Sequence, residues 1–241
     1  MRCRISAAVN HQELERAMLD VIEESLHRWR VGLVDDDPSA LRATARLLTV
    51  DGYDVSAYSS ASEFLESLEL GIPDVLLVDL RMPEVNGLEL QAALNERKLF
   101  LPMIFMSAYA SVASSVQALR GGAIDFLEKP YDRATLIAAL QRAIELASRE
   151  RKATSMRAEL VRSWRTLTRR EQEVCRWVVK GLLNKQIAAA IGTGEKTVKV
   201  HRARAMAKMH ADSVASLVRM VDALEDLPSA IAPGGEHQRA G

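Results

Sequence analysis

Short apolar segments alternate with amphipathic segments between residues 30 and 148. The apolar segments are bounded by Gly, Pro or Asp, and several are nearly continuous, which is typical of strands buried on both faces of a parallel sheet. A repeated strand-then-helix order predicts an α/β domain with a doubly wound, five-stranded parallel sheet of the flavodoxin-like type. The predicted strands are Val31–Asp35, Asp54–Tyr58, Asp74–Asp79, Pro102–Ser107 and Ala123–Leu127, and the predicted helices are Pro38–Val50, Ala61–Glu69, Asn86–Asn95, Ser111–Arg120 and Asp132–Ser148.

The pattern changes in the last third of the chain, where no strand pattern occurs. A short helix, a glycine-containing turn and a longer helix over 184–209 predict a helix-turn-helix within an all-α domain. The four helices predicted here are Arg169–Lys180, Asn184–Ile191, Glu195–Met209 and Ser213–Ala223. The whole chain therefore divides into an N-terminal extension (1–29), the α/β domain (30–148), a charged linker that partly continues the preceding helix (149–163), the helical domain (164–226) and a disordered tail (227–241).

Charge is unevenly distributed, although the net charge of the chain is zero. Residues 164–224 hold 12 Lys/Arg against 5 Asp/Glu, whereas residues 1–163 hold 19 against 24. A basic helical domain favours a nucleic-acid partner. The apolar runs are too short to cross a bilayer, and the first 30 residues lack the apolar centre of a signal peptide. We therefore expect a cytoplasmic protein without a membrane partner.

Chemically useful side chains stand where the predicted strands end. Asp35 and Asp36 end the first strand, Asp79 the third and Ser107 the fourth, while Lys129 follows the fifth. The carboxyl ends of parallel strands share one edge, and carboxylates gathered there need a cation, for which Mg²⁺ with its oxygen ligands is suited. Asp79 would attack a phosphoryl group as a nucleophile, Lys129 would offset its charge, and the Ser107 hydroxyl would donate a hydrogen bond to it.

These residues carry a resemblance to the receiver domain of two-component response regulators. The order of these residues and their successive separations are those of the family: 44 residues from Asp35 to Asp79, 28 from Asp79 to Ser107 and 22 from Ser107 to Lys129. The matching pieces are Val34-Asp35-Asp36, Val78-Asp79-Leu80-Arg81-Met82-Pro83, Gly87, Met106-Ser107-Ala108 and Glu128-Lys129-Pro130. In this family Thr is more frequent than Ser at the position of Ser107, but the hydroxyl is retained.

The resemblance implies further roles. Asp79 is the phosphoacceptor, and Asp35, Asp36, Asp79 and the backbone carbonyl of Arg81 hold Mg²⁺. Phe126 moves inward when Ser107 turns toward the phosphoryl group, and the Lys129–Pro130 bond is cis. The resemblance also implies a sensor histidine kinase as phosphodonor, and a homodimer, formed on phosphorylation through residues 111–148.

The helical domain resembles the LuxR-type DNA-binding domain, and the two domains together resemble FixJ-like and NarL-like regulators. The matching pieces are Leu167-Thr168-Arg169-Arg170-Glu171, Val174, Gly181, Asn184-Lys185-Gln186-Ile187-Ala188 and Thr197-Val198-Lys199-Val200-His201-Arg202. Thr168 and Glu171 form a capping box, and Val198, Ala205 and Met209 face the core. Lys199 and Val200 are the best candidates for base contacts. The full predicted DNA-binding set is Lys185, Lys196, Thr197, Lys199, Val200, Arg202, Ala203, Arg204 and Lys208.

Two alternatives remain open at this point. A phosphatase with an aspartyl-phosphate intermediate needs an acid/base carboxylate two residues after its nucleophile, where this chain has Arg81. A regulator that acts without phosphorylation would not need the complete acidic set. The favoured interpretation is a transcription regulator that catalyses only its own phosphorylation and dephosphorylation, with promoter DNA as a partner and RNA polymerase as a further candidate.

Overall fold

The computed structural model describes residues 27–109 and 111–225, which form two compact units divided between Arg149 and Glu150. The predicted extension over 1–29, apart from residues 27–29, and the predicted tail over 227–241 lie outside the described residues. Among the helices within the described ranges, none is both long enough and apolar enough to cross a membrane.

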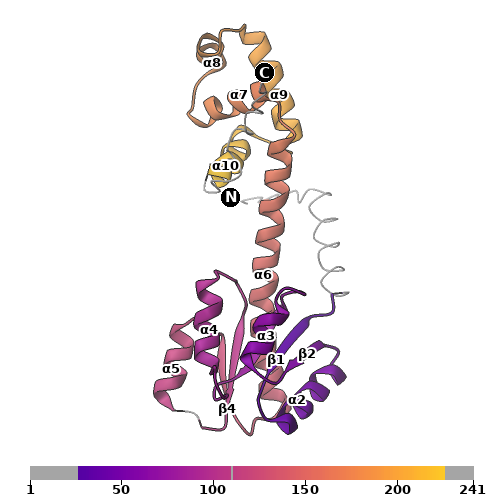
Figure 1. Ribbon diagram of the computed structural model, residues 1–241. Helices are drawn as coiled ribbons and strands as arrows, with labels where there is room; N and C mark the ends of the chain where they lie inside the picture. Colours follow the sequence, from indigo (N-terminus) through magenta and orange to yellow (C-terminus); the bar gives the residue numbers. More distant parts are fainter. Residues whose placement is uncertain (1–26, 110, 226–241) are drawn as a thin grey trace, which may run out of the picture. The chain divides into compact units, whose positions relative to one another are not determined.

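Five parallel strands form the sheet of the first unit, in the order β2-β1-β3-β4-β5 (Figure 1). The predicted α/β fold with a doubly wound parallel sheet is therefore confirmed. The strand order reverses beside β1, which places the binding edge of such a sheet at the carboxyl ends of β1 and β3. The strands are β1 (Arg30–Val34), β2 (Asp54–Tyr58), β3 (Val75–Asp79), β4 (Met103–Ser107) and β5 (Asp125–Glu128), and the helices are α2 (Pro38–Val50), α3 (Ala61–Ser67), α4 (Gly87–Glu96), α5 (Val112–Arg120) and α6 (Arg133–Arg165).

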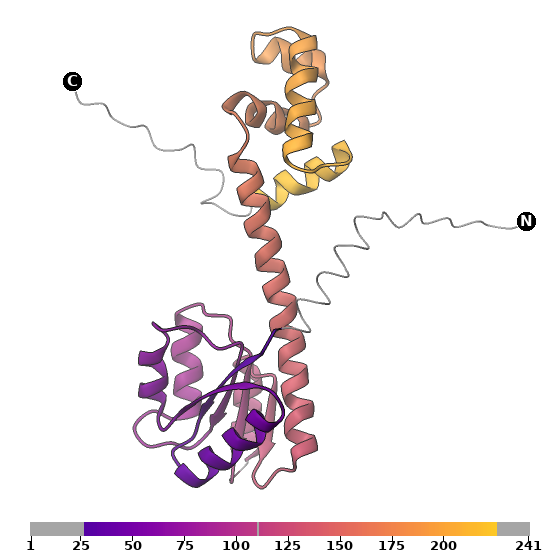
Figure 2. The same cartoon turned by 90° about the vertical axis from the view of Figure 1, so that its right-hand side faces the viewer.

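Helices cover both faces of this sheet (Figure 2). Phe64 of α3, Leu90 of α4 and Ala118 of α5 belong to one apolar cluster, whereas Leu48 of α2 and Leu136 of α6 belong to another. All five residues of β3 and all five of β4 are buried, as expected for central strands with helices on both sides. Because successive side chains along a strand point to opposite faces of the sheet, one strand can contribute residues to both clusters.

Helix α6 is longer than the sequence pattern predicts. The prediction ended the helix near Ser148 and assigned 149–163 to a linker that only partly continues it, whereas α6 continues to Arg165 over 33 residues. The segment from Arg133 to Arg165 contains neither Gly nor Pro and is rich in Ala, Arg, Glu and Leu, which have high helix propensity. A charged segment without helix-breaking residues therefore remains helical although it offers little apolar surface.

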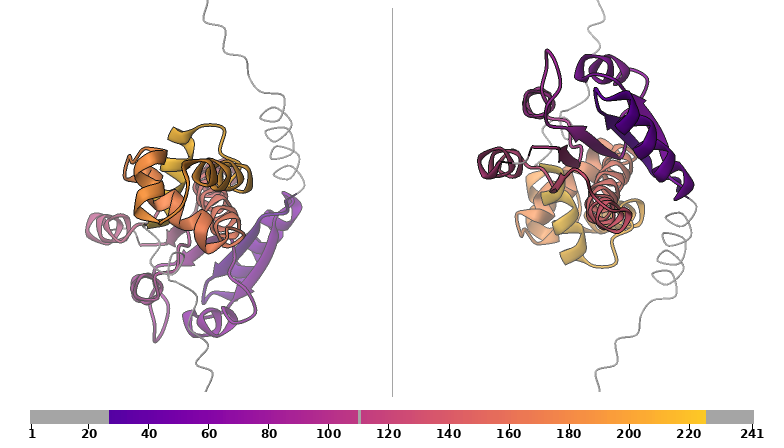
Figure 3. Two further views of the ribbon diagram at one scale, coloured as in Figure 1. Left: turned by 90° about the horizontal axis from the view of Figure 1, so that it is seen from above. Right: turned by 90° about the horizontal axis from the view of Figure 1, so that it is seen from below.

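Four helices follow in the second unit, which Figure 3 shows from above and below: α7 (Arg169–Val179), α8 (Asn184–Ala190), α9 (Glu195–Lys208) and α10 (Val214–Glu225). Helix α7 packs against α9 and α10, and α8 packs against α9. The predicted inward positions Val198, Ala205 and Met209 are buried in the core of this unit, as is Cys175. Gly181 and Gly192 adopt positive φ angles of 78° and 67° in the turns that end α7 and α8.

Gly87, the first residue of α4, lies against the end of β3. Its N–H donates to the carbonyl oxygen of Leu80 at 3.1 Å. A Cβ atom at this position would lie 2.6 Å from the carbonyl oxygen of Asp79 and 2.9 Å from the Phe105 ring. Backbone cannot move aside as a flexible side chain can, so only glycine allows α4 to begin this close to the sheet.

We expect Gly87→Ala to destabilise the first unit by about 1–3 kcal/mol, because the added methyl group overlaps backbone. Hydrogen-exchange mass spectrometry of peptides from β3 measures this loss without interference from the second unit. Gly194→Ala is the control for adding a methyl group, because a Cβ there would meet no atom nearer than Thr197 Oγ1 at 3.9 Å. Unchanged exchange of β3 in Gly87→Ala would contradict the steric argument.

Candidate functional site

The strand register brings four of the predicted site residues to one edge of the sheet. Val34 of β1 pairs with Val78 of β3, so Asp35 and Asp79 each stand one residue beyond a paired position on neighbouring strands. Asp79 pairs with Met106, and Ser107 of β4 pairs with Glu128 of β5. The N–H of Lys129 donates to the carbonyl oxygen of Ser107 at 2.8 Å, which continues the ladder beyond β5.

The ammonium group of Lys129 bridges two buried carboxylates. Its Nζ donates to Asp35 Oδ2 at 2.6 Å and to Asp79 Oδ1 at 2.5 Å. The other oxygens are also satisfied, because the N–H of Asp37 donates to Asp35 Oδ1 at 3.0 Å and the N–H of Arg81 donates to Asp79 Oδ2 at 2.7 Å. Asp35 is 2% exposed and Asp79 6% exposed, so Asp79 retains only a narrow opening to solvent.

Burial and charge act in opposite directions on this cluster. Burial raises the pKa of Asp79 above its ordinary value, although Lys129 and the N–H of Arg81 act to lower it. Burial lowers the pKa of Lys129, but the hydrogen bonds to Asp35 and Asp79 outweigh that effect, so the net pKa of Lys129 is raised. The ammonium is therefore charged at neutral pH, and two carboxylates share one positive charge.

Ser107 and Phe126 lie next to this cluster. Ser107 is 1% exposed, and its Oγ accepts a hydrogen bond from the N–H of Tyr109 at 3.2 Å. The ring of Phe126 is half-buried and stacks on Phe105, with ring centroids 6.4 Å apart and planes at 18°. The cis peptide bond predicted between Lys129 and Pro130 is present.

The structure does not gather every predicted metal ligand. Asp36 is exposed beside the buried Asp35. Within residues 27–109 and 111–225, no group of three or more His, Cys, Asp or Glu side chains is arranged to hold a metal ion. The donor set nevertheless suits a hard divalent cation, because one ammonium leaves a negative charge uncompensated on two carboxylates and Asp36 adds another.

Sequence reasoning missed two contacts around the site. The hydroxyl of Tyr131 donates to Met106 Sδ at 3.1 Å and lies 3.1 Å from Thr44 Oγ1, so it joins α2 to the strand that carries Ser107. The guanidinium carbon of Arg81 lies 5.0 Å from the centroid of the Tyr109 ring. Tyr131 directly follows Lys129-Pro130, and this position beside a predicted site residue was the sequence feature that could have pointed to its contacts.

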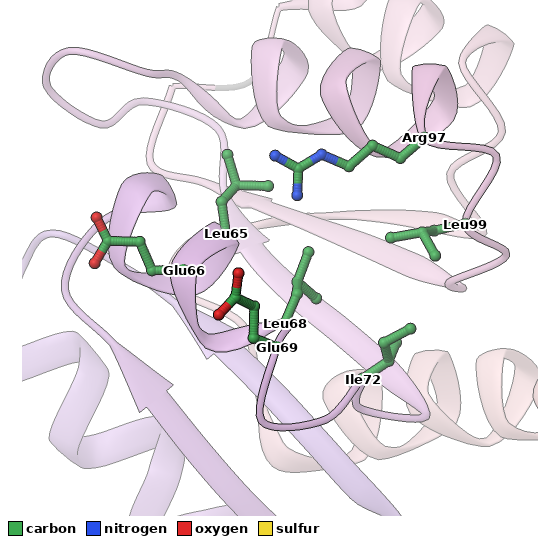
Figure 4. A pocket seen from close by; sticks show the side chains of 7 residues that line it. All are labelled: Leu65, Glu66, Leu68, Glu69, Ile72, Arg97 and Leu99. Atoms are coloured by element: carbon green, nitrogen blue, oxygen red, sulfur yellow. The ribbon is translucent and has the colours of Figure 1, made fainter.

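A surface hollow lies elsewhere on the first unit (Figure 4). It has a volume of about 450 Å³ and is lined from the ends of α3 and α4 and the loops that follow them. Because these helices run antiparallel to the strands, their ends lie at the opposite edge of the sheet from Asp79. Its lining residues, none of which belongs to the predicted site, are Leu65, Glu66, Leu68, Glu69, Ile72, Arg97 and Leu99.

Helix α9 presents most of the predicted DNA-binding residues to solvent. Lys185 on α8 is exposed as well. Arg202 is half-buried, with its Nη1 3.3 Å from Asn184 Oδ1, and Lys199 Nζ lies 3.6 Å from Glu195 Oε1. The exposed residues of this set on α9 are Lys196, Thr197, Lys199, Val200, Ala203 and Arg204.

Lys208 differs from the other predicted cations. Its Nζ donates to Glu171 Oε2 at 2.7 Å and to the carbonyl oxygen of Thr166 at 3.1 Å. Glu171 is 2% exposed, and its carboxylate also closes the predicted capping box with Thr168. The prediction that Lys208 contacts phosphate did not foresee this buried partner, because the sequence pattern does not show which carboxylate a lysine reaches.

Comparisons with known proteins match both units. The model of the response regulator receiver domain matches residues 31–141, and that of the bacterial regulatory proteins of the luxR family matches residues 165–221. Together these two matches cover more than half of the chain.

Relatives and solved structures share the same two-domain organisation. The response regulator protein TodT of Pseudomonas putida is 38% identical over 80% of this chain and 86% of its own length. The transcriptional regulatory protein FixJ of Rhizobium meliloti is 39% identical over 80% of this chain and 94% of its own. The solved structure of the response regulator StyR is 36% identical, with a TM-score of 0.71 over 81% of this chain and 99% of that chain. The chain belongs to the two-component response regulators that join a receiver domain to a LuxR-type DNA-binding domain.

Proposed function

We propose that this regulator accepts a phosphoryl group on Asp79 from a sensor histidine kinase and, once phosphorylated, dimerises and binds promoter DNA in the cytoplasm, with RNA polymerase as a further candidate partner. The observation that carries the proposal is the Lys129 ammonium 2.5 Å from Asp79 Oδ1. A carboxylate nucleophile needs an oxygen that can be released for attack and a fixed positive charge close to where the phosphoryl group arrives. Asp79 has both, because one oxygen can exchange its lysine contact for a bond to phosphorus.

The residues around Asp79 divide the work of phosphoryl transfer. The N–H of Arg81 holds Asp79 Oδ2 and so orients the carboxylate. Attack by Oδ1 forms the bond to phosphorus while the bond from phosphorus to the donor breaks. Lys129 then remains within reach of the transferred oxygens and offsets their charge. Ser107 supplies a hydroxyl donor once it leaves its present contact with the N–H of Tyr109.

Mg²⁺ is the cofactor we propose for this site. The carboxylates of Asp35, Asp36 and Asp79 and the backbone carbonyl of Arg81 would hold it, and it would neutralise charge on the phosphoryl oxygens. Lys129 now supplies the positive charge shared by Asp35 and Asp79. Exposed Asp36 is the ligand that has to turn inward to complete the set.

An apolar stripe on α5 supports dimerisation through the region 111–148. Val112, Val116 and Leu119 follow each other at helical spacing and are 82%, 40% and 49% exposed. Adjacent Tyr109 is 69% exposed and lies two residues after Ser107. Ser107 is thus close in sequence to this stripe, and burying the stripe against a second copy removes apolar surface from water.

DNA recognition is proposed for the exposed face of α9. Lys196, Lys199, Val200 and Ala203 form one helical stripe that faces solvent, with Thr197 and Arg204 beside it. A helix of this kind enters the major groove, where its side chains contact base edges and flanking cations contact phosphates. Lys185 on α8 and half-buried Arg202 complete the proposed DNA-binding set.

Asp79→Asn is expected to abolish phosphoryl uptake, because the amide is not a nucleophile for this transfer. Incorporation of label from radioactive acetyl phosphate measures the uptake. Asp37→Asn is the matched control, because Asp37 caps α2 through the N–H of Ser39 and asparagine caps equally well. Chelation of Mg²⁺ is expected to stop uptake by the wild-type chain too. Label retained by Asp79→Asn would show that another residue is the acceptor.

Val116→Asp is expected to prevent dimerisation by placing a charge in the apolar stripe. Light scattering with and without beryllofluoride, a phosphoryl mimic, measures the mass of each form. Wild type is expected to double its mass with the mimic, whereas Val116→Asp stays monomeric. Gln117→Asp adds the same charge to a neighbouring exposed position of α5 and should still dimerise. If Val116→Asp also dimerises, the stripe is not the interface.

Lys199→Ala is expected to weaken binding to a specific site by about 1–3 kcal/mol, the usual contribution of a lysine that contacts a base edge. The probe is a duplex selected by the wild-type protein from a randomised pool, and binding is followed by fluorescence anisotropy. Lys180→Ala removes an exposed lysine at the end of α7 and serves as the control. Equal affinity of Lys199→Ala and wild type would exclude Lys199 from base contact.

A further inference from the structure

Lys208 and Glu171 form an ion pair that joins the last turn of α9 to the first turn of α7. The side chain of Glu171 is 3% exposed and that of Lys208 36% exposed, with 2.7 Å between Nζ and Oε2. Burial raises the pKa of Glu171, but the hydrogen bonds from Lys208 and Thr168 outweigh it and hold the net pKa below its ordinary value. The carboxylate is therefore charged and depends on Lys208 for its positive partner.

The same two side chains also reach two backbone groups. Glu171 Oε2 accepts from the N–H of Thr168 at 2.8 Å, and Lys208 Nζ donates to the carbonyl oxygen of Thr166 at 3.1 Å. The N–H of Glu171 in turn donates to Thr168 Oγ1 at 3.3 Å. The end of α9 is thus attached to the turn between α6 and α7 and to the capping box of α7.

Helical geometry turns Lys208 away from the proposed DNA-binding stripe. Lys208 follows Lys199 by nine residues, and at about 3.6 residues per turn nine residues make two and a half turns. The two side chains therefore leave α9 on opposite sides. Lys208 follows Arg204 by about one turn, so it leaves α9 on the flank between the stripe and the buried face that carries Ala205 and Met209.

We propose that Lys208 and Glu171 are positioning residues for DNA recognition: their ion pair fixes the rotation and axial position of α9 against α7, and Lys208 does not contact phosphate. The proposal rests on the DNA-binding role proposed for α9. Val198, Ala205 and Met209 supply apolar packing along the same helix, but apolar contacts are not directional, whereas a buried ion pair admits few arrangements. Losing the pair lets α9 shift on α7, and base contacts then lose their register.

The test measures binding of the full chain to the selected duplex by fluorescence anisotropy, at 10 °C and in the presence of beryllofluoride. Only variants whose circular dichroism matches that of wild type are compared. The variants are Glu171→Gln, which keeps the cap acceptor but removes the charge, Lys208→Met, Lys208→Arg and the double variant Glu171→Gln/Lys208→Met. Lys180→Met is the charge-matched control. If Lys208→Met does not fold because Glu171 is left buried and unpaired, the double variant removes both charges and replaces it in the comparison.

We expect Glu171→Gln to weaken binding by about tenfold although Glu171 is buried, and the double variant to lose no more than a single variant, because both residues act through one contact. Lys208→Arg should retain most of the affinity. The dependence of log affinity on log salt should stay parallel to wild type in every variant, since no phosphate contact is removed.

Three results would overturn the proposal. In the first, the slope of log affinity against log salt becomes shallower by about one in Lys208→Met while Glu171→Gln binds normally, which would make Lys208 a phosphate contact. Wild-type affinity in all variants, with only a lower unfolding temperature, would make the pair a stability element alone. Losses that add in the double variant would show two independent roles. Failure of the DNA-binding role itself is recognised separately, because Lys199→Ala would then bind the duplex as wild type does.

Discussion

The arrangement of the receiver depends on one half-buried ammonium shared between two buried carboxylates. Asp35 and Asp79 end neighbouring strands, and without Lys129 their charges would be confined together in a site that is nearly closed to water. Removing one member of such a cluster leaves a buried charge without a partner and is strongly destabilising. The same cluster is chemically useful, because the ammonium already lies where a phosphoryl group on Asp79 would need it. The contact that pairs the two carboxylates is therefore also the one on which the proposed phosphoryl transfer relies.

The surroundings of this cluster explain how it stays accessible yet ordered. Gly87 allows α4 to begin against the backbone of Asp79, and Tyr131 joins α2 to Met106 beneath the edge. The loops after β3 and β4 remain at the surface, where Arg81 lies over Tyr109. The charged groups thus stand at the ends of the strands, whereas Arg81 and Tyr109 lie in the loops that follow β3 and β4.

The second unit uses its cations in two different ways. Lys199 and Arg204 are left exposed on α9, whereas Lys208 is directed inward to a buried carboxylate. A helix that carries binding residues on one side needs a fixed attachment on the other, since apolar packing alone tolerates small rotations. The cations of α9 therefore differ in their partners and not in their residue type: Lys208 has a buried carboxylate, whereas Arg204 is exposed.

Local sequence patterns alone predict the order of strands and helices, the parallel sheet and, to within one residue, the end of each strand, because hydrophobic periodicity and capping are local properties. They also place Asp35, Asp79, Ser107 and Lys129 at one edge, since parallel strands leave no other place for them. Only the tertiary structure decided that Lys129 bridges both carboxylates, that Asp36 stays exposed, that α6 continues to Arg165 and that Lys208 pairs with Glu171. Long side chains choose partners by distance across the fold, and Lys129 and Asp35 are 94 residues apart in the chain.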